Sequence, residues 1–134
     1  MASEKTTPQT KAIPYKKSED FEERYSNNVL LESSLWDLRL IFGKLDQQVP
    51  GNVIDQFCAI TLPWAQAKVL HYFLGIHLAG HELHNGRVQI PTGIIPAVPD
   101  SLTADFASDP KSQEIHDVFK AAYDEFIAEN PEAK

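Results

Sequence analysis

Cysteine is nearly absent from this chain of 134 residues, in which Cys58 is the only one. A single cysteine cannot form a disulfide within the chain, so the fold has no internal covalent cross-link of this kind. Cys58 lies in an apolar, strand-like run. This setting favours a buried structural thiol over a reactive one.

Basic residues are also few, with 12 Lys and Arg against 19 Asp and Glu and a net charge of −7. Because phosphate binding needs a basic stripe, this balance argues against nucleic acid as the main partner. The first residues, Met1–Lys5, lack the apolar stretch of a signal peptide. We therefore expect a soluble, cytoplasmic protein of bacterial type.

The common signatures of enzymes are missing as well. Ser33 and Ser34 lie at a predicted turn, but no G-x-S-x-G motif surrounds them. The only glycine-rich run, GKLDQQVPG, lacks the spacing of a phosphate-binding loop. Three carboxylates that could pair as general acids fall at turn or strand positions typical of solvated side chains, namely Asp37, Asp46 and Asp55. We expect neither enzyme activity nor a cofactor.

The chain is organised around one long predicted helix, from Trp64 to His84, which contains no proline. Gly86 follows in the place where a left-handed residue often ends a helix. Pro63 is expected in the first helical turn, where its missing N–H is no loss, with Thr61 or Leu62 as the cap. A membrane span is excluded because several polar side chains would enter hydrocarbon, namely Lys68, His71, His77, His81 and Glu82.

This helix is apolar on two sides, since successive residues lie about 100° apart on the helical wheel. One side carries Ala65, Val69, Tyr72, Ile76, Ala79 and Leu83. The other carries Ala67, Leu70, Leu74 and Leu78, and Phe73 lies between the two. Such a helix must be covered twice, by its own sheet and by either the C-terminal helix or a second copy of the chain. The residues expected at an interface are Trp64, Leu70, Phe73, Leu74 and Leu78.

Three segments before the helix have the composition and alternation of strands, namely Arg24–Ser33, Leu38–Phe42 and residues 53–61. A short turn at Ser34–Asp37 predicts that the first two pair antiparallel. Pro50-Gly51 indicates another turn. A short fourth strand is expected at Arg87–Ile90. The order β-β-β-α-β predicts an α+β fold, with an antiparallel sheet of three to four strands packed against one long helix.

The chain divides into three predicted parts. Residues 1–20 form a flexible arm, poor in apolar groups, and residues 21–100 form the α+β core domain. The core ends in a proline-rich connector that lies across a surface. Residues 101–134 add a C-terminal helix, from about Ser112 to Glu129, which Asn130-Pro131 ends. The lysines of the arm are either solvated or tether it to an acidic partner, and they are Lys5, Lys11, Lys16 and Lys17.

Three histidines lie within about 60° of one another on the predicted helix, and they are His77, His81 and His84. Imidazoles spaced by four residues suit a zinc site, and the run HLAGHELH contains a His-Glu pair. The metalloprotease motif H-E-x-x-H is not complete, however, because Asn85 stands where the second histidine belongs. We favour histidines on the edge of an amphipathic helix, with a metal site or a pH-sensitive interface as alternatives.

Two segments, Tyr25–Asp46 and Ile60–Pro91, resemble the bacterial family called domain of unknown function 3467. The family pattern falls on Tyr25 and Asn27, on Asp37 to Gly43, on Pro63, Ala67 and Lys68, and on Glu82 and Gly86. The resemblance covers roughly half the chain and implies no catalytic residues. The order of elements is also similar to that of the export chaperone SecB, which implies an oligomer with apolar surface for a partner.

These observations predict a small non-enzymatic module that forms a homodimer or higher oligomer and binds another protein. One alternative is a metal-binding protein or metal-dependent enzyme that uses the helix histidines, and another is a chaperone-like binder of apolar segments. Two tryptophans, Trp36 and Trp64, either pack in the core or anchor an interface.

Overall fold

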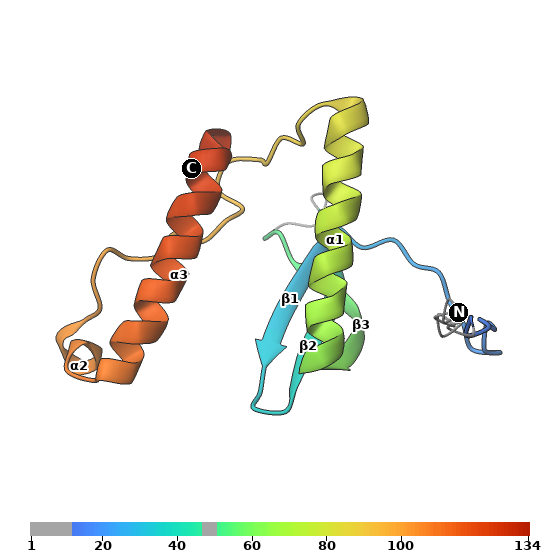
Figure 1. Cartoon of the computed structure of the whole chain (residues 1–134), viewed down its shortest axis with the longest axis horizontal. Helices are drawn as coiled ribbons and strands as arrows, with labels where there is room; N and C mark the ends of the chain where they lie inside the picture. The colour runs from blue at the N-terminus through green and yellow to red at the C-terminus, as the bar shows by residue number, and fades with distance from the viewer. Residues whose placement is uncertain (1–11, 47–50) are drawn as a thin grey trace, which may run out of the picture. The chain divides into compact units, whose positions relative to one another are not determined.

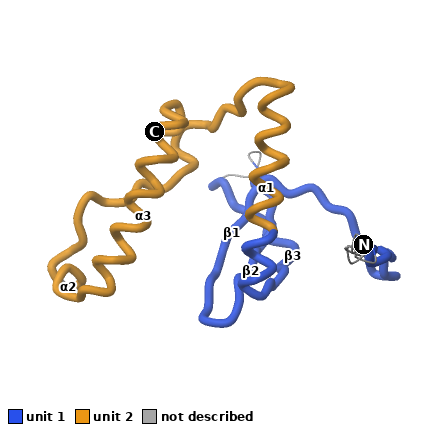
Figure 2. The backbone as a smooth tube through the Cα atoms, in the orientation of Figure 1, with its two compact units in different colours: residues 1–69 blue, residues 70–134 orange. Residues whose placement is uncertain are grey.

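The computed structural model describes residues 12–46 and 51–134. Most of the predicted arm and Pro50 of the predicted turn lie outside these residues. The elements are β1 (Asn28–Ser33), β2 (Asp37–Leu45), β3 (Ile54–Pro63), α1 (Trp64–Asn85), α2 (Ala104–Ala107), α3 (Pro110–Glu129) and a 3-10 turn, η1 (Pro131–Ala133). The chain forms two compact units, residues 1–69 and 70–134, which Figure 2 shows in different colours. The boundary falls within α1.

The three strands in the described part of the chain form one antiparallel sheet in the order β1-β2-β3. Leu40 lies at its centre, paired with Leu31 on one side and Ile60 on the other. The predicted α+β class is confirmed, with a long helix and a C-terminal helix after the sheet. Because β2 is the middle strand, β1 and β3 are both edge strands.

Ser34 holds the hairpin loop that joins β1 to β2. Its hydroxyl accepts the backbone N–H groups of Trp36 and Asp37, at 3.2 and 3.1 Å, and donates to the carboxylate of Asp37 at 2.8 Å. Its own backbone N–H donates to the Asp37 carbonyl at 2.9 Å. A serine hydroxyl that bonds to the nearby backbone is a common way to stabilise a turn.

Asn27 fixes the other end of this strand pair, and β1 therefore begins later than expected. The side-chain oxygen of Asn27 accepts the N–H of Leu45 at 2.8 Å, and its own N–H donates to the Gly43 carbonyl at 3.2 Å. Ser26 Oγ also donates to that carbonyl, at 2.8 Å. These side-chain bonds replace the regular ladder, which is why residues 24–27 of the predicted strand lie outside β1.

A β-bulge interrupts the pairing of β2 with β3. Phe42 pairs with Cys58, whereas the next residue, Gly43, pairs with Gln56, so Phe57 is the extra residue. A bulge of this kind bends the strand and redirects its side chains. Gly43 is buried beside the bulge, and a Cβ on it would lie only 2.7 Å from Ile54 Cγ2. A close approach of two strands therefore requires glycine at this position.

The observed end of the long helix agrees with the prediction from the sequence, but its observed start does not. β3 runs to Pro63 and α1 begins at Trp64, so the prediction of Pro63 in the first helical turn is wrong. Thr61 and Leu62, the predicted caps, are strand residues. Gly86 has a φ of 85°, and its N–H donates to the Glu82 carbonyl at 2.9 Å. This left-handed glycine ends the helix as expected.

The predicted fourth strand, Arg87–Ile90, does not form within the described chain. Carboxylate side chains take the place of a neighbouring strand. The N–H of Val88 donates to Glu82 Oε2 at 2.8 Å, and the N–H of Ile90 donates to Glu132 Oε1 at 3.3 Å. These bonds satisfy part of the backbone, and a β ladder here is therefore not required.

The C-terminal helix α3 begins at Pro110, two residues before the predicted start. The Asp109 carboxylate accepts the Lys111 N–H at 3.2 Å and the Ser112 hydroxyl at 2.8 Å, and Pro110 takes the first helical position. These two donors, the Ser112 hydroxyl above all, lower the pKa of Asp109. The helix ends before Asn130-Pro131, as predicted.

The connector before α2 contacts α3; the sequence predicted that it lies across a surface, but not which one. His116 is 7% exposed, and its Nε2 lies 2.6 Å from the Pro99 carbonyl. Because a carbonyl only accepts, Nε2 carries the proton. Lys120 lies 3.2 Å from Asp100 and 2.7 Å from Asp124, and hydrogen bonds to Asp124 and then Asp100 raise the pKa of its ammonium group.

Few apolar side chains are buried in the described residues. They are Ile41 in β2, Ala67 in α1 and Ala133 in η1. No helix in this part of the chain is long and apolar enough to cross a membrane.

Candidate protein-binding site

The middle of α1 is uncovered on every side. All residues from His71 to His81 are exposed, so both apolar sides of the helix face solvent over this stretch. The large apolar side chains of α1 that are exposed, with their exposed fractions, are Trp64 (43%), Val69 (42%), Tyr72 (64%), Phe73 (51%), Leu74 (59%), Ile76 (47%), Leu78 (51%) and Leu83 (82%). Exposed apolar surface of this extent makes α1 a candidate site of interaction.

Two opposite apolar sides run along this helix, and we name them by their residues. The Ile76 side is formed by Val69, Tyr72, Ile76 and Leu83, and the Leu74 side by Ala67, Leu70, Leu74 and Leu78. On the helical wheel the two sides lie roughly 170° apart. The Tyr72 and Phe73 rings have centroids 5.6 Å apart and form a continuous aromatic surface at the edge of the Ile76 side.

The predicted interface residues fall on this surface, with one exception. Trp64, Phe73, Leu74 and Leu78 are exposed, whereas Leu70 is half-buried. The Trp64 indole N–H donates to the Ser34 carbonyl at 3.0 Å and so fixes the start of α1 to the hairpin loop. Trp36, in that loop, is 79% exposed. Neither tryptophan is a core residue.

The three helix histidines are not gathered into a group of metal ligands. Within residues 12–46 and 51–134, no group of three His, Cys, Asp or Glu side chains can hold a metal ion. His77, His81 and His84 are all exposed, and Asn85 Nδ2 lies 3.4 Å from His81 Nδ1. Because Asn85 also donates to the His81 carbonyl at 3.1 Å, these two residues cap the end of the helix.

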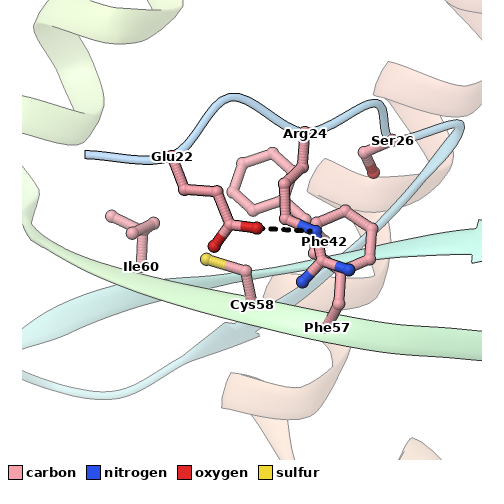
Figure 3. Close-up of a pocket in the computed structure, with 7 residues that line it drawn as sticks. All are labelled: Glu22, Arg24, Ser26, Phe42, Phe57, Cys58 and Ile60. Carbon is pink, nitrogen blue, oxygen red and sulfur yellow. Dashed lines mark ion pairs between the residues drawn. The ribbon is translucent and has the colours of Figure 1, made fainter. Parts of the chain in front are cut away.

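A pocket of about 360 Å³ opens over β2 and β3 in the first unit. Figure 3 shows its lining, which comes from both strands and from the segment before β1 and consists of Glu22, Arg24, Ser26, Phe42, Phe57, Cys58 and Ile60. The floor is apolar. Because the bulge places both Phe57 and Cys58 opposite Phe42, three neighbouring side chains reach the same side of the sheet.

Arg24 forms the polar rim of this pocket. Its guanidinium carbon lies 4.2 Å from the centre of the Phe57 ring, and its Nε lies 3.5 Å from Glu22 Oε1. The contact with the ring is a cation–π interaction. A cation stacked on an aromatic floor, with one weak carboxylate contact, offers a partner both apolar surface and a charged hydrogen-bond donor.

Cys58 is exposed, which contradicts the prediction of a buried thiol. The apolar run suggested burial, but β3 is an edge strand, and the bulge brings the thiol to the open pocket. An edge strand has a neighbour on one side only, so an apolar sequence there does not require burial.

A second group of charged residues lies in the second unit and joins the segment after α1 to η1. Arg87 donates to both carboxylate oxygens of Glu132, at 2.8 and 3.1 Å, and to the side chain of Asn130 at 3.2 Å. The guanidinium lowers the pKa of Glu132, and the carboxylate raises that of Arg87. Thr92 Oγ1 also donates to the Glu132 carbonyl, at 2.9 Å. We call this group of contacts the Arg87–Glu132 clasp.

No protein-family model, curated protein or solved structure matches this chain. The family resemblance and the similarity of layout to SecB therefore stay predictions.

The sequence predicted part of this candidate site and not the rest. The two apolar sides of the helix follow from its period, which places Tyr72 and Ile76 on one of them, although the predicted interface residues include neither. The sequence predicted that both sides are covered, whereas all residues from His71 to His81 are exposed. The sequence did not predict the pocket over β2 and β3. Arg24 and Phe57 are 33 residues apart in the sequence, and only the bulge brings them into contact.

Proposed function

We propose that this chain is a non-enzymatic protein-interaction module that works as a homo-oligomer, with α1 forming the contacts between copies. The observation that carries the proposal is that every residue of α1 from His71 to His81 is exposed, on both the Ile76 side and the Leu74 side. A helix gains most of its stability from packing its apolar face. A helix with two open apolar sides therefore needs two packing partners.

A second copy is the simplest partner for such a surface. Eight exposed apolar side chains at about 100 Å² each offer roughly 800 Å² per chain, divided between the two sides, where a stable interface buries about 800 Å² per partner. The same helix in a second copy offers an identical surface, so a two-fold axis beside α1 pairs like with like on one side, and a further copy covers the opposite side. The open pocket on the sheet is then left for a different protein, whose apolar side chain it accommodates beside Arg24.

The test is the molar mass measured by light scattering after size exclusion. The wild-type chain is expected at a multiple of 15.0 kDa. Ile76→Glu and Leu74→Glu each place a charge on one apolar side and are expected to weaken association at least about a hundredfold, because a buried unpaired charge is costly. Circular dichroism checks that the variants keep their helices.

Gln66→Glu is the matched control, since it adds the same charge at an exposed position in a polar sector of α1. Its mass is expected to equal that of the wild type. A wild-type chain of 15.0 kDa at all concentrations overturns the proposal. Equal loss of mass in all three variants also overturns it, because charge alone would then explain the effect.

A further inference from the structure

The segment before the sheet carries apolar side chains that its own chain leaves uncovered. Residues 12–27 contain no helix or strand up to the start of β1. Ile13 is 82% exposed, Tyr15 is fully exposed and Tyr25 is 73% exposed. Around Lys17 the segment is nevertheless ordered locally, because the ammonium lies 4.9 Å from the Phe21 ring and the Phe21 N–H donates to the Ser18 carbonyl at 3.1 Å.

Helix α3 has one side that is occupied and one that is not. His116 and Lys120 hold the connector against the first side. The opposite side carries an apolar stripe with a spacing of three and four residues, formed by Ile115, Val118, Phe119, Ala122 and Phe126. Ile115 is 51% exposed, Val118 65% and Phe119 61%. The apolar stripe of an amphipathic helix is normally covered by another part of the protein.

Charge distinguishes the two surfaces. Residues 70–134 carry ten Asp and Glu against four Lys and Arg, a net charge of −6. Glu114, Glu125 and Glu129 lie along one edge of the α3 stripe, within roughly 100° of its centre on the helical wheel. The segment around Tyr15 is basic instead, because Lys16 and Lys17 follow it directly.

We propose that residues 13–17 of one copy dock along the α3 stripe of a second copy. Ile13 and Tyr15 pack on the apolar side chains, and Lys17 faces the glutamates at the edge. In an extended segment, residues 13, 15 and 17 point to the same side. The segment spans about 13 Å at 3.3 Å per residue, and the stripe from Ile115 to Phe126 spans about 16 Å at 1.5 Å per residue. The two lengths match.

A second copy is the occupant that satisfies both surfaces at once. Within a single chain the segment and the stripe from Ile115 to Ala122 are exposed, whereas Phe126 at the end of the stripe is half-buried. Each copy contributes one basic apolar segment and one acidic apolar stripe, so a two-fold pair exchanges segments reciprocally and leaves neither open. This exchange rests on the proposed homo-oligomer, and it adds a contact separate from the α1 surface.

The test is disulfide trapping between two chains, both in a Cys58→Ser background. One chain carries Tyr15→Cys and the other Val118→Cys, and the mixture is oxidised after mixing. A covalent heterodimer is expected. Asp117→Cys replaces Val118→Cys as the control, because Asp117 is exposed on α3 but lies outside the stripe. The proposal requires clearly less product from the control. Equal yields overturn it.

A charge exchange tests the same contact without cysteine. Lys16→Glu with Lys17→Glu is expected to weaken association about tenfold, and Glu114→Lys with Glu125→Lys on the same chain is expected to restore it. If these variants leave the mass unchanged while Ile76→Glu dissociates the oligomer, the segment exchange is wrong and the α1 proposal stands. A further variant carries Tyr15→Cys and Val118→Cys on the same chain. If its disulfide forms within one chain, at a rate independent of concentration, the segment docks on the α3 stripe of its own chain and the exchange between copies is wrong.

Discussion

At the residue scale, Gly43 and Cys58 show how the bulge between β2 and β3 determines the character of the sheet. The bulge brings Gly43 so close to β3 that a side chain has no room, and it turns Cys58 toward the pocket. Gly43 is thus constrained by the adjacent strand β3, whereas the Cys58 side chain is exposed. Both consequences depend on Phe57, the extra residue.

Gly43→Ala is expected to lower the free energy of unfolding by about 1–3 kcal/mol, as overpacked positions do. The new Cβ would lie 2.7 Å from Ile54 Cγ2 and 3.1 Å from the Asp55 carbonyl oxygen. Ile54 can change rotamer, but the backbone of Asp55 cannot move without disturbing the strand pair. Urea unfolding followed by circular dichroism measures the change.

Gly75→Ala is the matched control for this experiment. A Cβ at Gly75 meets nothing within 4 Å, and helix interiors favour alanine over glycine by about 0.5–1 kcal/mol. The control is therefore expected to be more stable than the wild type. If both substitutions change stability in the same direction, the steric explanation for Gly43 is incorrect.

Cys58 is expected to react with a soluble thiol reagent in the native protein, without denaturant, because its side chain is exposed. An environment-sensitive dye attached there then reports on the pocket. Its emission is expected to shift when an unfolded apolar polypeptide is added and to stay constant with the folded form of the same polypeptide. A thiol that reacts only in urea contradicts the exposed position.

At the element scale, the segment after α1 shows how side chains replace a strand. Glu82 and Glu132 accept the backbone N–H groups of Val88 and Ile90, and Arg87 completes the clasp with η1. The Glu132 carboxylate takes part in two of these links. The local structure of residues 87–93 therefore depends more on the ionised carboxylate of Glu132 than on β propensity.

The clasp is expected to open in acid. The Arg87 guanidinium holds the pKa of Glu132 below its ordinary value of 4.5. A carboxyl group whose pKa is lower in the folded state stabilises the fold above its unfolded pKa, and this contribution is lost as the pH falls through the folded pKa. The Ile90 amide signal in NMR spectra is expected to remain constant above about pH 5 and to shift below pH 4.5.

Glu132→Gln is expected to remove this pH dependence and to leave the Ile90 amide less protected at neutral pH. Glu129→Gln is the control, because the structure shows the Glu129 backbone carbonyl, and not its side chain, in contact with Arg87. The control should titrate like the wild type. Identical titration in Glu132→Gln would falsify the assignment of the transition to this carboxylate.

At the scale of the whole molecule, the scarcity of buried apolar side chains is the dominant feature. A single chain with only Ile41, Ala67 and Ala133 as buried apolar residues in its described part has little core to offset the loss of chain entropy. Exposed apolar surface is present on α1, on α3 and around the pocket. In the proposed homo-oligomer, association adds the apolar burial that the single chain lacks.

The melting temperature is therefore expected to rise with protein concentration. For a dimer that unfolds as it dissociates, a tenfold increase in concentration adds about 1.4 kcal/mol per dimer, and a dimer of two such chains gains about 3 °C. Scanning calorimetry at two concentrations measures this shift. The Ile76→Glu variant serves as the monomeric control, and its melting temperature should not depend on concentration.

The sequence by itself determined the α+β class and the position of the long helix. Trp64 to His84 contains no proline and has apolar residues on two sides, and Gly86 ends it, because each of these signals acts within a few residues of the chain. The strand order of the hairpin and the end of α3 follow for the same reason. The two apolar sides of α1 also follow from its period, but the exposure of both sides does not.

Only the tertiary structure decided the pocket, the exposure of Cys58 and the fate of residues 87–90. The pocket needs Arg24 against Phe57, and the clasp needs Arg87 against Glu132, which are 45 residues apart. Neither pairing has a local signal, because contacts between distant residues depend on how the backbone turns between them. The bulge exposes Cys58, although its apolar neighbours predicted burial. The carboxylates of Glu82 and Glu132 bind the backbone of residues 88 and 90, where the sequence predicted a fourth strand.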